Sequence, residues 1–186
     1  MQRGRFLTGA IGSMSAVALA PLSHRALASQ AVSIRLVATP MRFSPAAGIT
    51  VNAIGYNGSI PGPLLRVRQG QRVRIEYINA SSIATSVHWH GVILPNAMDG
   101  AAGVTQTPVG HGGRFVYDFT PQPSGTRWYH DHGDDLGVLR GLFGMFVIED
   151  PRDEPADVEF AVIFHDVPDF ASVRSAIAGT SHAPMI

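Results

Sequence analysis

Two short segments of this sequence each carry a pair of histidines two positions apart. The first pair is His88 and His90, and the second is His130 and His132. In an extended strand, side chains at positions i and i+2 point to the same face, and each residue rises by about 3.3 Å. One such pair can therefore bind a single metal ion or reach two neighbouring ions. The two pairs together predict a metal site.

The residue types in these segments narrow the choice of metal. Imidazole suits copper, zinc, nickel and iron. The sequence contains no cysteine, and neither segment carries a carboxylate cluster, which weakens the case for a structural zinc site. Copper is the favoured metal. A blue (type 1) copper centre is excluded within this chain because it needs a cysteine thiolate beside two histidines.

The neighbours of the histidines are expected to support them rather than to bind metal. Trp89, Trp128 and Tyr129 would exclude water and fix the imidazole rotamers, and we do not assign them an electron-transfer role. Asp131 would point away from the histidine face, either behind the ligands or into solvent. His111 lies in a glycine-rich turn and is expected to be exposed rather than metal-bound.

The segments that must position the histidines alternate in polarity between turn residues, as is typical of a β-sandwich. Eight or so strands are expected, which favours an all-β Greek-key sandwich. Residues 69–71 separate two of these strands and are predicted to form a tight hairpin connection. The expected strands include residues 32–36, 65–68, 72–77, 86–90, 115–119, 127–130, 142–149 and 159–164.

Composition limits the protein's size class and its partners. The chain has 186 residues, of which 45% are apolar and 15% are charged, enough for one domain with a sizeable core. Lys plus Arg equal Asp plus Glu at 14 each, so no net charge attracts nucleic acid. We therefore expect no nucleic-acid partner.

Residues 1–28 are predicted to be an export signal peptide. A basic start at Arg3 and Arg5 precedes an apolar run, and Ala26-Leu27-Ala28 is a small-residue cleavage pattern. The apolar run is too short to anchor the chain in a membrane. Because Gly4 stands where a twin-arginine signal has its second arginine, both twin-arginine export and general secretion stay open. The mature protein is expected to be periplasmic or secreted.

Several blocks of the sequence together resemble the N-terminal, plastocyanin-like domain of multicopper oxidases, the laccase-like enzymes. In family order, they are residues 56–63, 70–75, 85–91, 98–106 and 125–132. Ordered agreement of this kind is more specific than any single motif. The resemblance implies a cupredoxin-like Greek-key sandwich over residues 29–150. Residues 151–186 would then be a linker and the start of a second, missing domain, so that the chain resembles a truncated oxidase.

The resemblance also implies roles for individual residues. His88 would bind a type 2 copper ion, and His90, His130 and His132 would bind the paired type 3 ions of a trinuclear cluster. Such a cluster reduces dioxygen to water with electrons from one-electron oxidation of a small reducing substrate or metal ion. Asp99 would help to supply protons near the type 2 ion, although its Asp-Gly context alone favours a simple turn.

Three hypotheses follow from the absence of a type 1 cysteine and of the other four cluster histidines. The favoured one is the N-terminal part of a multicopper oxidase, inactive alone and requiring a second cupredoxin domain in the same chain or in another subunit. The second is a stand-alone exported copper-binding module for storage or delivery. The third is a copper-free sandwich used for protein contact, which the presence of all four histidines argues against.

Overall fold

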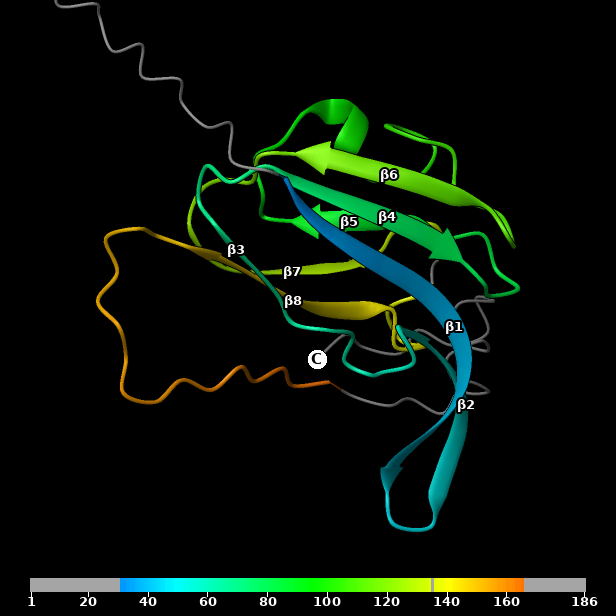
Figure 1. Cartoon of the computed structure of the whole chain (residues 1–186). Helices are drawn as coiled ribbons and strands as arrows, with labels where there is room; N and C mark the ends of the chain where they lie inside the picture. The colour runs from blue at the N-terminus through cyan, green and yellow to red at the C-terminus, as the bar shows by residue number, and fades with distance from the viewer. Residues whose placement is uncertain (1–30, 135, 166–186) are drawn as a thin grey trace, which may run out of the picture.

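A computed structural model describes residues 31–134 and 136–165, so the predicted signal at 1–28 lies outside the described residues. Eight strands form two four-stranded sheets that pack face to face (Figure 1). One sheet has the order β2 (Ile49–Tyr56), β1 (Val32–Ala46), β4 (Val73–Asn79), β6 (Arg114–Phe119). The other, the histidine sheet, has the order β3 (Leu65–Arg68), β8 (Phe143–Glu149), β7 (Gly125–Asp131), β5 (Val87–His90). The predicted all-β sandwich is confirmed.

The core lies between the sheets and is built from the alternating apolar positions of the strands. In β4, Val73, Ile75 and Tyr77 are fully buried, whereas the intervening Arg74 is exposed. Trp89 of β5 is also fully buried. Its ring centroid lies 5.2–5.9 Å from those of four aromatic residues, an arrangement that stabilises packing beyond simple burial. These neighbours are Tyr117, Phe119, Tyr129 and Phe146.

The predicted hairpin at residues 69–71 is wrong. The turn itself exists, with the N–H of Gln71 bonded to the carbonyl of Arg68 at 3.0 Å. However, it connects β3 and β4, which belong to different sheets. β3 pairs in parallel with β8, and β4 pairs with β1 and β6. The same turn chemistry serves a hairpin and a corner between sheets, so local residues could not separate the two.

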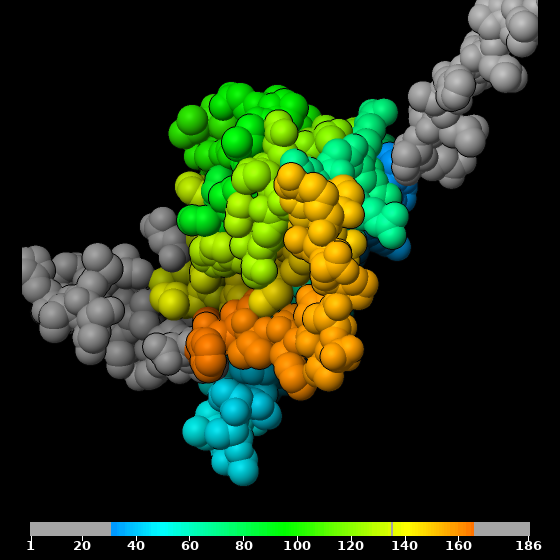
Figure 2. All heavy atoms as spheres, turned by 90° about the vertical axis from the view of Figure 1, so that its left-hand side faces the viewer, coloured from blue at the N-terminus to red at the C-terminus, as the bar shows by residue number. Residues whose placement is uncertain are grey.

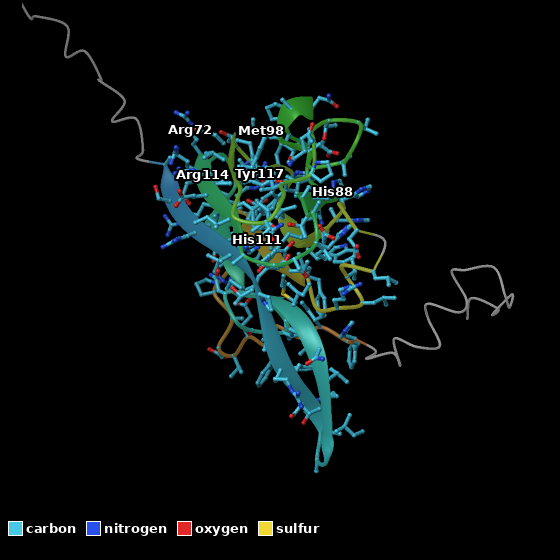
Figure 3. The ribbon with its side chains drawn as sticks, turned by 90° about the vertical axis from the view of Figure 1, so that its right-hand side faces the viewer. Arg72, His88, Met98, His111, Arg114 and Tyr117 are labelled. Carbon is cyan, nitrogen blue, oxygen red and sulfur yellow. The ribbon has the colours of Figure 1, made fainter. Side chains whose placement is uncertain are left out.

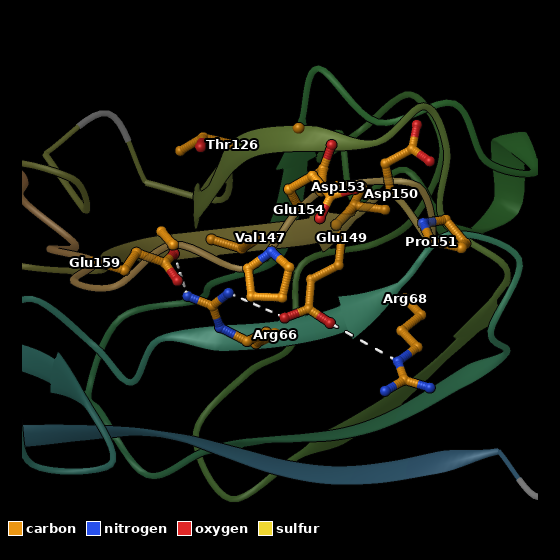
Figure 4. A pocket seen from close by; sticks show the side chains of 14 residues that line it. Arg66, Arg68, Thr126, Val147, Glu149, Asp150, Pro151, Asp153, Glu154 and Glu159 are labelled. Carbon is orange, nitrogen blue, oxygen red and sulfur yellow. Dashed lines mark hydrogen bonds and ion pairs between the residues drawn. The ribbon is translucent and has the colours of Figure 1, made fainter.

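The predicted strand at residues 159–164 is also wrong, because the segment is extended without strand pairing. Its apolar side chains alternate as in a strand, yet Phe160 and Phe164 are 83% and 95% exposed. Figure 2 shows the segment, in orange, on the surface of the domain. Arg66 holds it near its start through an ion pair of 2.5 Å with Glu159 (Figure 4). Alternation predicts an extended chain but does not supply a partner strand.

The first hairpin is longer than the sequence indicated. β1 continues to Ala46 and β2 returns from Ile49, so that the pair extends beyond the sandwich as a two-stranded arm (Figure 1). The residues at the tip of the arm are exposed. Because the tip meets no core, its residues lack the burial pattern that identifies the other strands.

Candidate metal centre

The histidine sheet positions three of the four predicted ligands through its strand register. In β5, Val87 and Trp89 point into the core, so His88 and His90 point to the outer face of the sheet. His88 is directly opposite His130 of β7. His132 follows the end of β7. Figure 3 shows His88 on the side of the sandwich away from Arg72 and Arg114.

The imidazoles converge. Potential ligand atoms of His88, His90 and His130 all lie within 4.8 Å of one another. The ring centroid of His132 is 5.4 Å from that of His88 and 6.1 Å from that of His130. The structure therefore brings the two sequence pairs into one cluster, with His132 beside a closer group of three.

Backbone carbonyls determine which ring nitrogens of His88 and His130 carry the hydrogen. The Nδ1 atom of His88 lies 2.8 Å from the carbonyl oxygen of Asp99, and that of His130 lies 2.8 Å from the carbonyl oxygen of Asp131. A carbonyl only accepts, so both Nδ1 atoms carry the hydrogen, and in the neutral ring the lone pair is on Nε2. The Nε2 atom of His130 lies 3.4 Å from Nδ1 of His90. Hydrogen bonds from Nδ1 to a backbone carbonyl orient histidines that bind metals through Nε2.

Burial keeps the imidazole of His130 uncharged. It lowers the pKa of His130 to about 4, and the neighbouring His88, His90 and His132 add to this effect. The ring of Trp128 stacks on that of His130 at a centroid distance of 4.1 Å. A neutral imidazole can donate its lone pair to a metal ion at neutral pH.

Asp99 lies next to the cluster. It follows the short 3-10 helix η1 (Asn96–Met98) and is partly exposed. Its Oδ2 atom is 3.4 Å from Nδ1 of His88, in addition to the bond from its backbone carbonyl. Gly100 follows it with a φ of +80°. The Asp-Gly turn and the contact with a histidine therefore occur together.

Asp131 is buried behind the histidines rather than exposed to solvent. As expected, its carboxylate faces away from the imidazoles, but solvent is excluded because the residue is only 3% exposed. Its oxygens accept N–H groups from Ser86, Gly133 and Asp134 at 2.9–3.1 Å. Burial raises the pKa of Asp131 to about 6, and the three hydrogen bonds oppose the shift. Apart from the alternation of β7, no local pattern indicates this role.

The remaining histidines of the described region do not join the cluster. His111 is exposed, as predicted, and its Nδ1 lies 2.8 Å from the carbonyl oxygen of Ser81. His165 has its ring 4.4 Å from that of Phe143. No helix within the described residues has the length and hydropathy needed to cross a membrane.

The donor set fits copper. All four side chains offer imidazole nitrogen, which copper accepts readily, and the lone pairs of His88 and His130 are on Nε2 because their Nδ1 atoms bond carbonyls. His90 and His132 are exposed, so the cluster opens outward from the sheet. A metal ion held here would have room for further ligands from outside the domain.

Comparison with known proteins places this chain in a family. The family model described as multicopper oxidase matches residues 38–153. Copper resistance protein A of Pseudomonas syringae pv. tomato is 42% identical over 116 residues, 61% of this chain and 19% of that protein. Multicopper oxidase MmcO of Mycobacterium tuberculosis is 35% identical over 86% of this chain and 31% of its own length.

A solved structure agrees. The multi-copper oxidase from Pseudomonas thermotolerans matches with a TM-score of 0.63 at 39% identity, over 68% of this chain and 31% of that chain. The fold and the site together define a cupredoxin-like domain with a cluster of histidines on one sheet. The chain belongs to the multicopper oxidase family. It spans between 18% and 31% of the length of the first five curated relatives.

Proposed function

We propose that this chain acts as the N-terminal cupredoxin domain of a multicopper oxidase and supplies half of the histidine ligands of a trinuclear copper cluster. His88 binds the type 2 ion, and His90, His130 and His132 bind the type 3 ions. The observation that carries the proposal is the approach of His88, His90 and His130 to within 4.8 Å on one sheet face. Membership of the family supports the choice of copper.

The open side of the cluster supports the need for a second domain. His90 and His132 are exposed, which leaves the cluster accessible to the histidines of another cupredoxin domain, in the same chain or another subunit. The copper ions, when bound, supply the reduction of dioxygen to water with electrons from a small reducing substrate or metal ion. The domain itself holds the imidazoles oriented and close together, and its burial of His130 keeps that ring uncharged.

Asp99 is proposed to deliver protons during oxygen reduction. Its side chain is 30% exposed and its carboxylate lies 3.4 Å from the His88 ring, so it can exchange protons with water beside the cluster. Asp99→Asn keeps the backbone carbonyl that orients His88. In an active oxidase it should therefore lower turnover while leaving copper content unchanged.

Copper binding by this chain tests the ligand assignment. Anaerobic titration with Cu(II), followed by electron paramagnetic resonance, should show nitrogen-coordinated copper in the wild-type chain. His88→Ala and His130→Ala should remove that signal, whereas the control His111→Ala should keep it. Uptake that is unchanged in both cluster variants would contradict the assignment.

A chimera tests the oxidase function. Residues 32–149 would replace the matching segment of the multi-copper oxidase from Pseudomonas thermotolerans, whose fold agrees with this chain. We expect oxygen consumption with a reducing substrate, and its loss in His88→Ala or His130→Ala with the blue type 1 absorption retained. A folded chimera that retains full turnover in both variants would refute the proposal.

A second candidate function is a stand-alone copper-binding module for storage or delivery. It is favoured by the fact that three ligand positions already converge within this domain. Tight copper binding by the chain combined with an inactive chimera would support it over the oxidase.

We also propose that the protein is exported to the periplasm or secreted, on the basis of the signal pattern in residues 1–28. N-terminal sequencing of the protein from a secreting host should give a mature start near Ser29 or Gln30. An uncleaved cytoplasmic product would contradict this.

A further inference from the structure

Strand β5 carries two of the four histidines but has little backbone support. It is four residues long and, among the described strands, pairs only with β7. A short edge strand has one hydrogen-bonded neighbour, so contacts outside the ladder must help to fix its position. The residue just before β5, Ser86, is fully buried.

Ser86 joins three segments that meet at the cluster. Its N–H donates to Oδ1 of Asp131 at 2.9 Å, and its hydroxyl donates to the carbonyl oxygen of Gly100 at 2.7 Å. Its own carbonyl accepts the N–H of His132 at 3.2 Å. One residue therefore links the start of β5, the loop that contains Asp99 and the chain that leaves β7.

The Asp131 carboxylate completes this connection. Besides Ser86, it accepts the N–H groups of Gly133 at 3.1 Å and Asp134 at 3.0 Å. Space for it depends on Gly137, where an added Cβ would lie 1.9 Å from Oδ2. A buried carboxylate held by three donors has a fixed position, because moving it would leave polar groups unpaired.

Both carbonyls that orient the imidazoles depend on this pair. The carbonyl bonded to Nδ1 of His130 belongs to Asp131 itself. The carbonyl bonded to Nδ1 of His88 belongs to Asp99, next to the Gly100 carbonyl that Ser86 holds. We propose that the Ser86–Asp131 pair is a positioning element that sets the tautomers and the aim of His88 and His130. The identity of the bound metal rests on the proposed function, whereas the arrangement of the imidazoles does not.

Two variants separate the two arms of the pair. Asp131→Asn keeps the side-chain shape but replaces one acceptor oxygen with an NH2 group, and should disturb both imidazoles. Ser86→Ala removes the bond to Gly100 but keeps the N–H bond to Asp131, and should therefore disturb His88 alone. Asp134→Asn is the matched control, because the Asp134 carboxylate accepts the N–H of Leu136 at 2.9 Å and lies 3.7 Å from Nε of Arg140, neither of which bonds a histidine ring among the described residues.

Two readouts distinguish orientation from mere stability. Nitrogen-15 NMR of the metal-free chain should show His88 and His130 each as a single Nδ1–H tautomer. Asp131→Asn should average both tautomers and weaken Cu(II) binding about 10- to 100-fold, the usual effect of losing a group that orients a ligand. Ser86→Ala should average only His88. Leu36→Ala, in the core of the other sheet, should lower the unfolding midpoint and leave both tautomers fixed.

The outcomes are separable. The proposal is wrong if folded Asp131→Asn keeps both tautomers and wild-type copper affinity, or if Leu36→Ala alters the tautomers as well. If Asp131→Asn does not fold, Ser86→Ala decides: selective loss of the His88 tautomer supports the proposal, and an unchanged His88 refutes it. If the wild-type chain binds no copper but the tautomers respond as described, the proposed function fails and the positioning role stands.

Discussion

The imidazoles of His88 and His130 are oriented directly by backbone carbonyls. Asp99 and Asp131 each use a main-chain carbonyl to hold Nδ1 of a neighbouring histidine at 2.8 Å. Such bonds survive substitution of the side chain but not movement of the backbone. The geometry of the cluster is therefore most sensitive to residues that fix the backbone path, such as Gly100.

Replacing Gly100 tests this sensitivity. Its φ is +80°, and an added Cβ would lie 1.9 Å from the carbonyl oxygen of Val87. Left-handed backbone costs an L-residue about 1–2 kcal/mol, and overpacking adds about 1–3 kcal/mol. We expect Gly100→Ala to lower the free energy of unfolding by about 3 kcal/mol in urea denaturation and to weaken copper binding.

Gly103→Ala is the control for that substitution. Gly103 has a similar φ of +74°, but an added Cβ would meet nothing within 4 Å. Only the backbone cost of about 1–2 kcal/mol should remain, with copper binding intact. Equal losses in the two variants would show that the contact with Val87 does not matter.

At the scale of elements, β5 is connected to the opposite sheet as well as to its own. The N–H of Val87 donates to the hydroxyl of Tyr117, on β6, at 2.8 Å. Tyr117 and Val87 are both fully buried, so water cannot replace this hydrogen bond. The tyrosine hydroxyl thus fixes the strand from the side that faces the core.

Tyr117→Phe should destabilise the domain by about 1–3 kcal/mol, because it leaves a buried N–H without a partner. Tyr56→Phe is a matched control, since the hydroxyl of Tyr56 is buried and has no hydrogen-bond partner among the described residues. That control should leave stability unchanged or slightly higher. Thermal unfolding followed by circular dichroism compares the two, and a larger loss in Tyr56→Phe would contradict the assignment.

A second connection between elements holds the extended segment after β8. Arg66 bonds Glu149 at 3.0 Å and Glu159 at 2.5 Å, so it joins β3, the end of β8 and the segment (Figure 4). Arg66→Ala should speed limited proteolysis within residues 150–160 several-fold and leave the global unfolding midpoint unchanged, because exposed ion pairs stabilise a fold only weakly. Arg68→Ala, whose contact with Glu149 is 4.0 Å, should have little effect on cleavage. Equal cleavage in both variants would argue against this connection.

For the whole molecule, the four histidines are brought together by folding. Copper that binds them should therefore stabilise the folded domain. A ligand that binds only the native state adds about 2.7 kcal/mol at a concentration 100 times its Kd. Thermal unfolding of the wild-type chain and of His111→Ala should therefore shift upward with Cu(II) and return with a chelator. His130→Ala should show no shift. A comparable shift in His130→Ala would locate the stabilising copper elsewhere.

Sequence alone determined the features that depend on local spacing and polarity. The i, i+2 spacing of the histidine pairs indicated one face of a strand, and the structure has His88 and His90 on one face of β5. The alternation of Leu65 and Val67 with arginines likewise predicted a half-buried strand, which is β3. Ordered motifs favoured the family to which the chain belongs.

Only the tertiary structure decided which strands are neighbours. The register of β5 with β7 sets His88 opposite His130, and no local pattern contains that pairing. The same limit explains the wrong hairpin at residues 69–71 and the unpaired segment at 159–164, because the pairing of a strand depends on contacts with residues far away in the sequence. Asp131 is the clearest example: its spacing correctly gave the direction of its side chain, but its burial and three N–H donors arise from segments that fold around it.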